Sequence, residues 1–168
     1  LRALQNLRDN DATLILTVDC GISAYETLNA VHDDGLDVIV IDHHLAGPTL
    51  PNAKAIVNPN RLDDDSGFGY LCAAGVCFIT CVSLLRALRQ IGLTDLPDLF
   101  SVLDLVALAT LCDVVPIKNL NRAFIRQGLK IMRRRRNIGL AALADVAGLD
   151  RAVGEYECSF ILGPRINA

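Results

Sequence analysis

Two runs of apolar residues, each followed at once by ionisable side chains, constrain the fold of this chain more than any other feature. Residues 14–18 and 37–41 are short, uninterrupted and rich in β-branched side chains, which is typical of buried strands. Between them, residues 23–26 (SAYE) fit a capping box that opens a helix, and Gly35 is a natural helix stop. A strand, a helix and a second strand in this order predict a parallel sheet.

The remainder of the chain changes from strands to helices. Residues 55–57 fit a short third strand, and the polar, glycine-containing residues 61–70 fit a loop. Apolar or amphipathic stretches then predict helices at residues 71–90, 99–111, 121–134 and 140–146. We therefore expect an α/β fold: a parallel sheet flanked by helices over about residues 1–60, and a mainly helical C-terminal half over about residues 70–168.

The composition supports a folded domain and excludes other classes. With 168 residues, of which 52% are hydrophobic, the chain can bury a core, which a disordered segment cannot. No run reaches the roughly 18 uncharged apolar residues that a membrane span needs, because the longest one ends at Arg86 and Arg89. No signal peptide is visible, since the first residues already have a helical pattern. The net charge of −3 neither points to a nucleic-acid binder nor excludes one, since bound cations would offset an acidic pocket.

The ends of the chain and its cysteines indicate the context in which it works. The sequence has no initiator Met and ends without a tail, so we expect an internal piece of a longer protein. None of the six cysteines forms a Cys-x-x-Cys pair, which favours buried free thiols in a reducing cytosol, and hence a cytoplasmic protein. Cys77 and Cys81 would share one face of a helix, which leaves a structural zinc site open as the alternative.

Ionisable side chains stand where the predicted strands end. Asp19 follows the first strand, and Asp42, His43 and His44 follow the second. Open α/β sheets bind ligands at this edge, and neighbouring strands lie about 4.8 Å apart, so a carboxylate and an imidazole from the two strands can reach one cation. Oxygen and nitrogen ligands together suit Mn²⁺ or a similar ion. Asp113, at a turn after an apolar helix, is a further candidate, because a charge there is costly unless it is paired or metal-bound.

Each of these residues also has an ordinary structural interpretation. An acid at a strand end is often only a helix cap or a turn former, and two adjacent histidines can belong to a solvated loop. For three other features that interpretation is the favoured one. These are residues 63–65 as an acidic solvated loop, residues 133–136 as a helix end where cations suit the dipole, and His32 as a solvent-facing helix residue. Contact with DNA phosphates is the alternative for residues 133–136.

Several motifs, in the expected order, give the chain a resemblance to the DHH phosphoesterase family. Residues 40–44 (VIDHH) resemble the motif that names the family, and residues 17–21 (TVDCG) resemble its preceding aspartate motif. Within the family, RecJ-type exonucleases have segments similar to residues 73–76 (AAGV), 105–116 (LVALATLCDVVP) and 162–168 (LGPRINA). The similarity runs across nearly the whole chain, and its last segment favours the RecJ type over sister families.

The resemblance implies roles for the residues at the sheet edge. Asp19 would bridge two divalent ions, Mn²⁺ or Mg²⁺, and His43 and Asp113 would complete the protein ligands of one of them. His44 would face the scissile phosphate, as a hydrogen-bond donor or a proton source. Asp42 would hold the imidazole in one tautomer.

Beyond that edge, the resemblance implies that Arg165 and Asn167 contact the nucleic-acid backbone or help to shape the site. The family's earlier motif, an Asp-x-Asp that follows an apolar strand and supplies further metal ligands, does not occur in this sequence, so we expect the piece by itself to be inactive. The parent enzyme would digest single-stranded DNA from its 5′ end by two-metal phosphodiester hydrolysis, in repair and recombination. Two alternatives stay open. One is another DHH enzyme, such as a pyrophosphatase or a cyclic-dinucleotide or oligonucleotide phosphodiesterase; the other is a metal-free scaffold.

Overall fold

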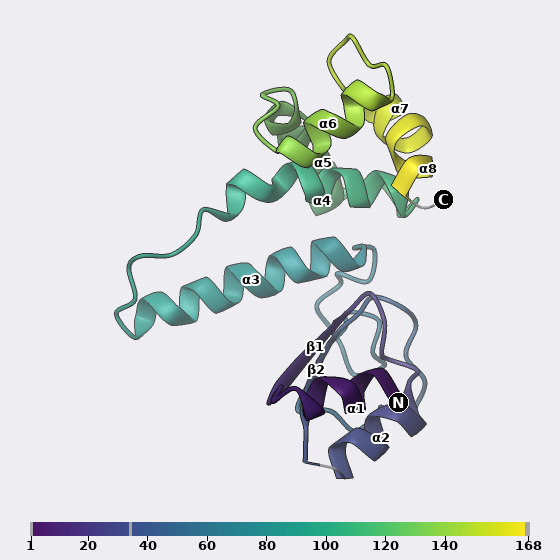
Figure 1. Ribbon diagram of the computed structural model, residues 1–168, viewed down its shortest axis with the longest axis vertical. Coiled ribbons are helices and arrows are strands. Elements are labelled where there is room, and N and C mark those ends of the chain that lie inside the picture. Colours follow the sequence, from purple (N-terminus) through teal and green to yellow (C-terminus); the bar gives the residue numbers. More distant parts are fainter. Residues whose placement is uncertain (1, 34, 167–168) are drawn as a thin grey trace. The chain divides into compact units, whose positions relative to one another are not determined.

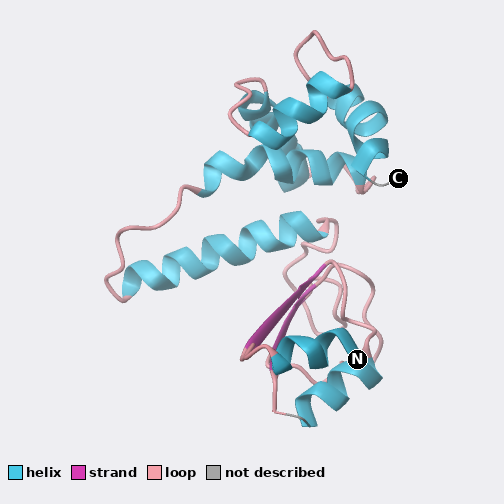
Figure 2. Cartoon of the chain, in the orientation of Figure 1, coloured by secondary structure: helices cyan, strands magenta, loops and turns pink. Residues whose placement is uncertain are grey.

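The computed structural model describes residues 2–33 and 35–166. The chain divides into two compact units, Leu1–Gly69 and Tyr70–Ala168. The strands drawn in Figure 2 belong to the first unit, and the elements described in the second unit are all helical. The predicted α/β class, with a helical C-terminal half, is therefore confirmed.

The first unit is a three-stranded parallel sheet with two helices. In chain order, its elements are α1 (Arg2–Asp9), β1 (Leu14–Val18), α2 (Tyr25–Asp33), β2 (Asp37–Ile41) and β3 (Ala55–Val57). The strands lie in the order β1-β2-β3, with Leu14 opposite Asp37 and Ile41 opposite Val57. Figure 1 labels β1 and β2. The predicted strand–helix–strand unit and the short third strand are confirmed.

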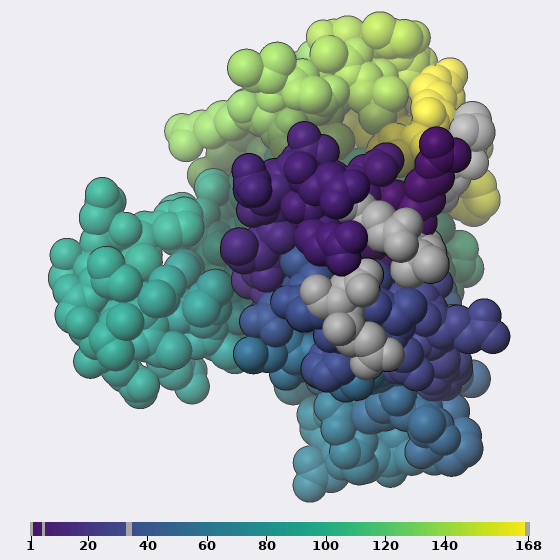
Figure 3. Space-filling model, turned by 60° about the horizontal axis from the view of Figure 1, so that its bottom comes forward, coloured from purple at the N-terminus to yellow at the C-terminus, as the bar shows by residue number. Residues whose placement is uncertain are grey.

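The sheet has one buried face against α2 and one open apolar face along β1. The buried cluster joins three strand residues to two residues of α2: Ile15, Val38, Val40, Leu28 and Val31. Because side chains alternate along a strand, Leu14, Leu16 and Val18 point to the opposite face, where they are 47%, 54% and 48% exposed. The dark purple atoms in Figure 3 show α1 on the surface of this unit, where most of its side chains are exposed.

The second unit is a set of packed helices. Its elements are α3 (Ala73–Gln90), η1 (Leu99–Val102), α4 (Leu103–Cys112), α5 (Asn119–Met132), α6 (Ile138–Val146), α7 (Glu155–Glu157), η2 (Cys158–Leu162) and α8 (Gly163–Ile166). Leu111 of α4 and Leu129 of α5 belong to one buried core. Gly128 lets α4 and α5 approach closely, because a Cβ atom at this position would collide with the Leu103 carbonyl oxygen.

α3 is long and apolar enough, by length and composition, to cross a membrane, with 18 residues and a mean hydropathy of 1.3. The uncharged apolar run is shorter, as the sequence indicated, and the helix reaches 18 residues only by continuing through Arg86 and Arg89 to Gln90. Phe78 of α3 packs edge-on against Phe124 of α5, with ring centroids 5.2 Å apart. The helix thus contributes to the core of the second unit.

The C-terminal helices differ in part from the predicted ones. The helix expected over residues 99–111 begins with the 3-10 turn η1, where the Asp98 carboxylate accepts a hydrogen bond of 2.9 Å from the Phe100 amide. η2 is a π-helical turn, and it was not predicted, nor were α7 and α8. Residues 133–136 follow the end of α5 as expected, and Arg135, with a φ of 52°, turns back to pair with Asp145 at 2.5 Å.

All six cysteines are free. Cys72 and Cys158 are buried as expected, whereas Cys20 and Cys81 are exposed, which corrects the expectation of buried thiols for these two. Desolvation disfavours the thiolate and raises the pKa of Cys158 to about 12. Within residues 2–33 and 35–166, no cysteine belongs to a group of three or more His, Cys, Asp or Glu side chains that could hold a metal ion.

Gly128→Ala tests the close approach of α4 and α5. The added methyl group has no room beside the Leu103 carbonyl, so we expect the free energy of unfolding to fall by about 1–3 kcal/mol, the usual cost of overpacking. Urea titration followed by circular dichroism measures the loss. Gly139→Ala in α6 is the matched control, because its Cβ would meet no atom closer than 3.5 Å, and stability should stay level or rise slightly. Equal losses in both variants would contradict this account.

Candidate metal centre

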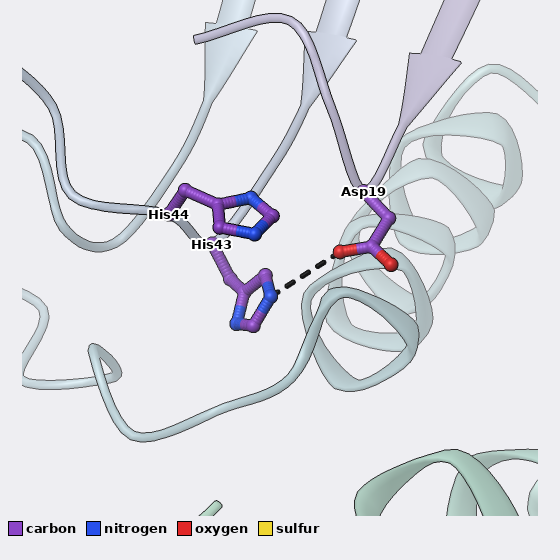
Figure 4. A group of neighbouring side chains, drawn as sticks. All are labelled: Asp19, His43 and His44. Atoms are coloured by element: carbon purple, nitrogen blue, oxygen red, sulfur yellow. Dashed lines mark ion pairs between the residues drawn. The ribbon is translucent and has the colours of Figure 1, made fainter. Parts of the chain in front are cut away.

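Asp19, His43 and His44 come together where β1 and β2 end. One ligand atom from each lies within 4.8 Å of the others, and Figure 4 shows the three side chains converging. Nε2 of His43 lies 3.2 Å from a carboxylate oxygen of Asp19. The Asp19 side chain is 61% exposed and that of His43 is 14% exposed, so the group opens to solvent on the carboxylate side.

The chain turns sharply at Asp19. Its amide still donates to the Ile41 carbonyl at 3.0 Å, in continuation of the parallel ladder, but its φ of 63° is left-handed. Only a few per cent of non-glycine residues adopt this conformation, and aspartate is among those that tolerate it best. Gly21, with a φ of 116°, completes the turn. A larger residue would not fit there, because its Cβ atom would lie 2.8 Å from the Thr17 hydroxyl. The turn ends the strand and directs the Asp19 carboxylate towards His43.

Asp42 lies beneath the histidines, with its side chain 1% exposed. One oxygen accepts hydrogen bonds from the amide of His43 (2.7 Å), the amide of His44 (3.2 Å) and Nδ1 of His44 (2.7 Å). The other accepts from the amide of Ile22 at 3.0 Å. Burial raises the pKa of Asp42, but the hydrogen bonds from Ile22, His44 and His43 together outweigh it and hold the pKa below its ordinary value.

The ionised state of Asp42 determines the tautomer of His44. A carboxylate only accepts hydrogen bonds, so Nδ1 of His44 must carry the hydrogen in their 2.7 Å contact. In the neutral ring, Nε2 then carries a lone pair, and in the protonated ring it carries a hydrogen that can be donated. His44 can therefore ligate a cation or donate to a substrate oxygen, while its orientation stays the same.

Two asparagines after β3 hold the backbone of the histidine segment, and the sequence analysis did not identify them. Asn58, which is 3% exposed, donates from its side chain to the His44 carbonyl at 2.9 Å, and Asn60 donates to the His43 carbonyl at 2.6 Å. A Cβ atom on Gly69 would collide with the Asn60 amide oxygen, so a glycine is needed there. The only signal in the sequence was an Asn-Pro-Asn turn at a strand end, which has many other uses.

Asp113 lies in the second unit, at the C-terminal end of α4. Its side chain is exposed, and Val114 follows with a φ of 56°. Gly163 at the start of α8 packs on the same helix end, because its Cβ would lie 2.7 Å from Cys112 Sγ. Asp113 and the segment of Arg165 therefore share one corner of this unit. Arg165 is exposed and donates to the Ile161 carbonyl at 2.7 Å; Asn167 lies outside the described residues.

The acidic loop at residues 63–65 and His32, which were expected to be ordinary surface features, contact only neighbouring groups or solvent in the interactions described below. Arg61 donates to both oxygens of Asp63, at 2.9 and 2.5 Å, and its third bond holds the Ile56 carbonyl at 2.9 Å. Asp64 accepts hydrogen bonds from the amide and hydroxyl of Ser66. The acidic loop is thus organised by its own neighbours, and His32 is exposed on α2.

Known proteins resemble this chain over most of its length. The profile described as the DHH family, N-terminal domain, matches residues 2–110. The chain is 42% identical over 165 residues to the single-stranded-DNA-specific exonuclease RecJ of Dickeya dadantii, and 38% identical over 168 residues to that of Bacillus subtilis. The alignments cover 94% and 99% of this chain but only 28% and 20% of the relatives.

Two crystal structures share the fold. A structure of exonuclease RecJ bound to manganese matches with a TM-score of 0.80 and 33% identity, over 99% of this chain and 40% of the other. A structure of RecJ from Thermus thermophilus in complex with Mn²⁺ matches with a TM-score of 0.76 and 33% identity, over 98% of this chain and 24% of the other. Both units therefore belong to a fold that recurs within longer proteins.

Asp42→Asn tests whether the buried carboxylate organises the site. An asparagine amide group would turn donors towards N–H groups that now donate to Asp42, which leaves buried donors unsatisfied. We expect a loss of about 1–3 kcal/mol in the free energy of unfolding, measured by chemical denaturation in EDTA. Asp63→Asn, at a carboxylate that is 65% exposed, is the control and should change little. If the two variants were equally stable, the four hydrogen bonds would not be the organising contact.

Proposed function

The chain belongs to the DHH family, and from that premise we propose that it is the metal-binding part of an exonuclease acting on single-stranded DNA. The observation that supports this most directly is the convergence of Asp19, His43 and His44 at the carboxyl edge of the sheet. The named relatives are single-stranded-DNA-specific exonucleases, and the chain spans 28% of the first of them. Activity and substrate are accordingly proposals for the whole protein.

The side chains at this edge fit a divalent cation such as Mn²⁺ or Mg²⁺. The Asp19 carboxylate and the His43 imidazole, with the His44 ring within 4.8 Å of both, offer oxygen and nitrogen donors, which suit Mn²⁺ better than a thiolate-binding ion. Structures of RecJ were solved with manganese and with magnesium. When bound, a pair of such cations supplies charge neutralisation at the phosphate and activates the attacking water.

The ligands divide between the two units. Asp19 has two carboxylate oxygens in an exposed turn and would serve both ions. His43 would ligate one ion through Nε2, which already faces Asp19 at 3.2 Å. Asp113, on the second unit, would complete the same ion's protein ligands. The alternative of a metal-free scaffold has no use for this donor set, so the ligand geometry favours an enzyme.

His44 is assigned to the substrate. Its Nδ1–H is held by Asp42 at 2.7 Å, so the ring presents Nε2 in one direction. Protonated at Nε2, it would donate to a phosphate oxygen or give a proton to the leaving group, and the Asp42 carboxylate would balance the ring's charge. Asp42 does not touch the substrate in this scheme; it positions His44.

The remaining assignments concern the nucleic acid and its processing. Arg165, at the corner shared with Asp113, and Asn167 would contact the sugar–phosphate backbone. By similarity to the named relatives, the substrate would be single-stranded DNA. The family resemblance of the sequence motifs further implies digestion from the 5′ end, in the cytoplasm, during repair and recombination.

Substitutions in the full-length protein separate the roles of Asp19 and the two histidines. Asp19→Asn should lower kcat by about 1,000-fold or more, since a ligand shared by both ions is lost. His43→Ala should weaken Mn²⁺ binding. His44→Ala should lower kcat by about 100- to 10,000-fold, the range of a general acid, and leave Mn²⁺ affinity nearly unchanged. Isothermal titration with Mn²⁺ and release of mononucleotides from single-stranded DNA give the two readouts.

The outcome for His44 decides between its two chemical possibilities. A loss of Mn²⁺ affinity in His44→Ala as large as that in His43→Ala would make His44 a ligand and overturn its assignment to the substrate. Normal turnover by Asp19→Asn would overturn the proposal of metal-dependent hydrolysis at this site.

Asn60→Ala tests the support beneath His43. Without its donor, the His43 carbonyl loses a bond of 2.6 Å and the ligand segment loosens, so we expect Mn²⁺ affinity to fall about 10- to 100-fold. Asn29→Ala is the control, since the Asn29 side chain accepts a hydrogen bond from the Asn52 amide at an exposed position, away from the histidine segment. Unchanged Mn²⁺ affinity in Asn60→Ala would show that His43 needs no such support.

A further inference from the structure

The net charge of the chain conceals a separation of charge along it. Eight of its 16 lysines and arginines fall within residues 114–144, a stretch without any aspartate or glutamate. The rest of the chain holds the other eight cations and all 19 acids. A net charge of −3 is therefore compatible with one strongly basic element, which is the electrostatic footprint of a nucleic-acid-binding surface.

α5 presents four of these cations along one groove. Arg122, Arg126, Lys130 and Arg133 are exposed and line a groove of about 420 Å³ in the second unit. They recur at intervals of four, four and three residues, so they form a single stripe about 16 Å long at 1.5 Å of rise per residue.

The stripe is not used to stabilise the fold. Other arginines of this unit are paired, Arg135 with Asp145 and Arg151 with Glu157, each at 2.5 Å. In the part of the chain that the structure describes, no carboxylate forms an ion pair with any of the four groove cations. Glu155 is the one acid that lines the groove. Four like charges held side by side, with the single acid Glu155 in the same groove, repel one another, and a polyanion would relieve this repulsion.

We propose that the α5 groove binds the backbone of the single-stranded DNA beyond the metal centre, an inference that rests on the proposed function. Ile117, which lines the groove, follows Asp113 by four residues, so at full extension the two lie within about 14 Å. Among the four groove cations, Arg122 is then the nearest to the proposed ligand in sequence, and Arg133 is the most distant. The strand would pass from the metal centre along α5, one phosphate after another.

The apolar surface of the groove is small. Ile125 and Leu129, at 4% exposure each, belong to the core beneath it, and Ile117, at 57% exposure, is the apolar side chain of its lining that a base could contact. Such a surface distinguishes no sequence, and the cations contact phosphates only. Binding along α5 is therefore sequence-independent and falls steeply with salt.

The test is a salt titration of DNA binding by the full-length protein in EDTA, where hydrolysis cannot occur. Anisotropy of a fluorescein-labelled oligodeoxythymidylate gives the dissociation constant at each NaCl concentration. Arg126→Gln combined with Lys130→Gln should weaken binding about tenfold in low salt and reduce the slope of log affinity against log salt by about 1.4, at 0.7 for each lost phosphate contact. Arg126→Lys keeps the charge and should preserve the slope.

Arg2→Gln combined with Arg86→Gln removes the same charge from exposed positions outside the groove and is the matched control. An unchanged slope in the groove variant, or an equal fall in the control, overturns the proposal. The proposal is also overturned if the groove variant loses binding of a polyglutamate peptide while the salt slope of its DNA binding stays intact, since the occupant is then an acidic protein segment.

With Mn²⁺ present, the groove variant should show a raised KM and an unchanged kcat at saturating DNA. Because the salt titration contains no metal, its result for the groove remains valid even if Asp19→Asn proves active and the proposed metal-dependent hydrolysis fails.

Discussion

The buried carboxylate of Asp42 is the contact on which the rest of the site depends. It is 1% exposed and accepts four N–H donors, from Ile22, His43 and His44. An ionised group in such a place is tolerated only because every donor is aligned with it, and its lowered pKa expresses the same balance. The hydrogen bond from Ile22 ties the turn after β1 to the end of β2. The two strand ends that hold Asp19 and the histidines are thereby kept in register.

Around this contact, the site is assembled by backbone restraint. The left-handed turn at Asp19 directs its carboxylate towards His43. Asn58 donates a hydrogen bond to the His44 carbonyl, and Asn60 donates one to the His43 carbonyl. Side chains that must meet a cation gain from such restraint, because ordering them at the moment of binding would cost affinity. The ligands that this unit supplies are thus already oriented before a cation binds.

The two units divide the proposed work between them. The first presents an acidic and imidazole-containing edge at its sheet, and the second presents Asp113 at one helix end and the cationic groove of α5 farther along the chain. Opposite charges serve opposite tasks: carboxylates concentrate cations, and guanidinium groups neutralise phosphates. Gly128 allows α5 to lie close against α4, so the helix that carries the groove packs directly on the helix that ends at Asp113.

Local patterns in the sequence were enough to predict the parallel sheet and the placement of Asp19 and His43 at one edge, because strand periodicity is local and parallel strands end on the same side. Tertiary packing alone determined which amides reach Asp42, since Ile22 is 20 residues away and no pattern records a hydrogen-bond partner. The same holds for Asn58 and for the concave shape of the α5 groove. Contacts of this kind arise when separate elements pack, and a single sequence contains the residues without their distances.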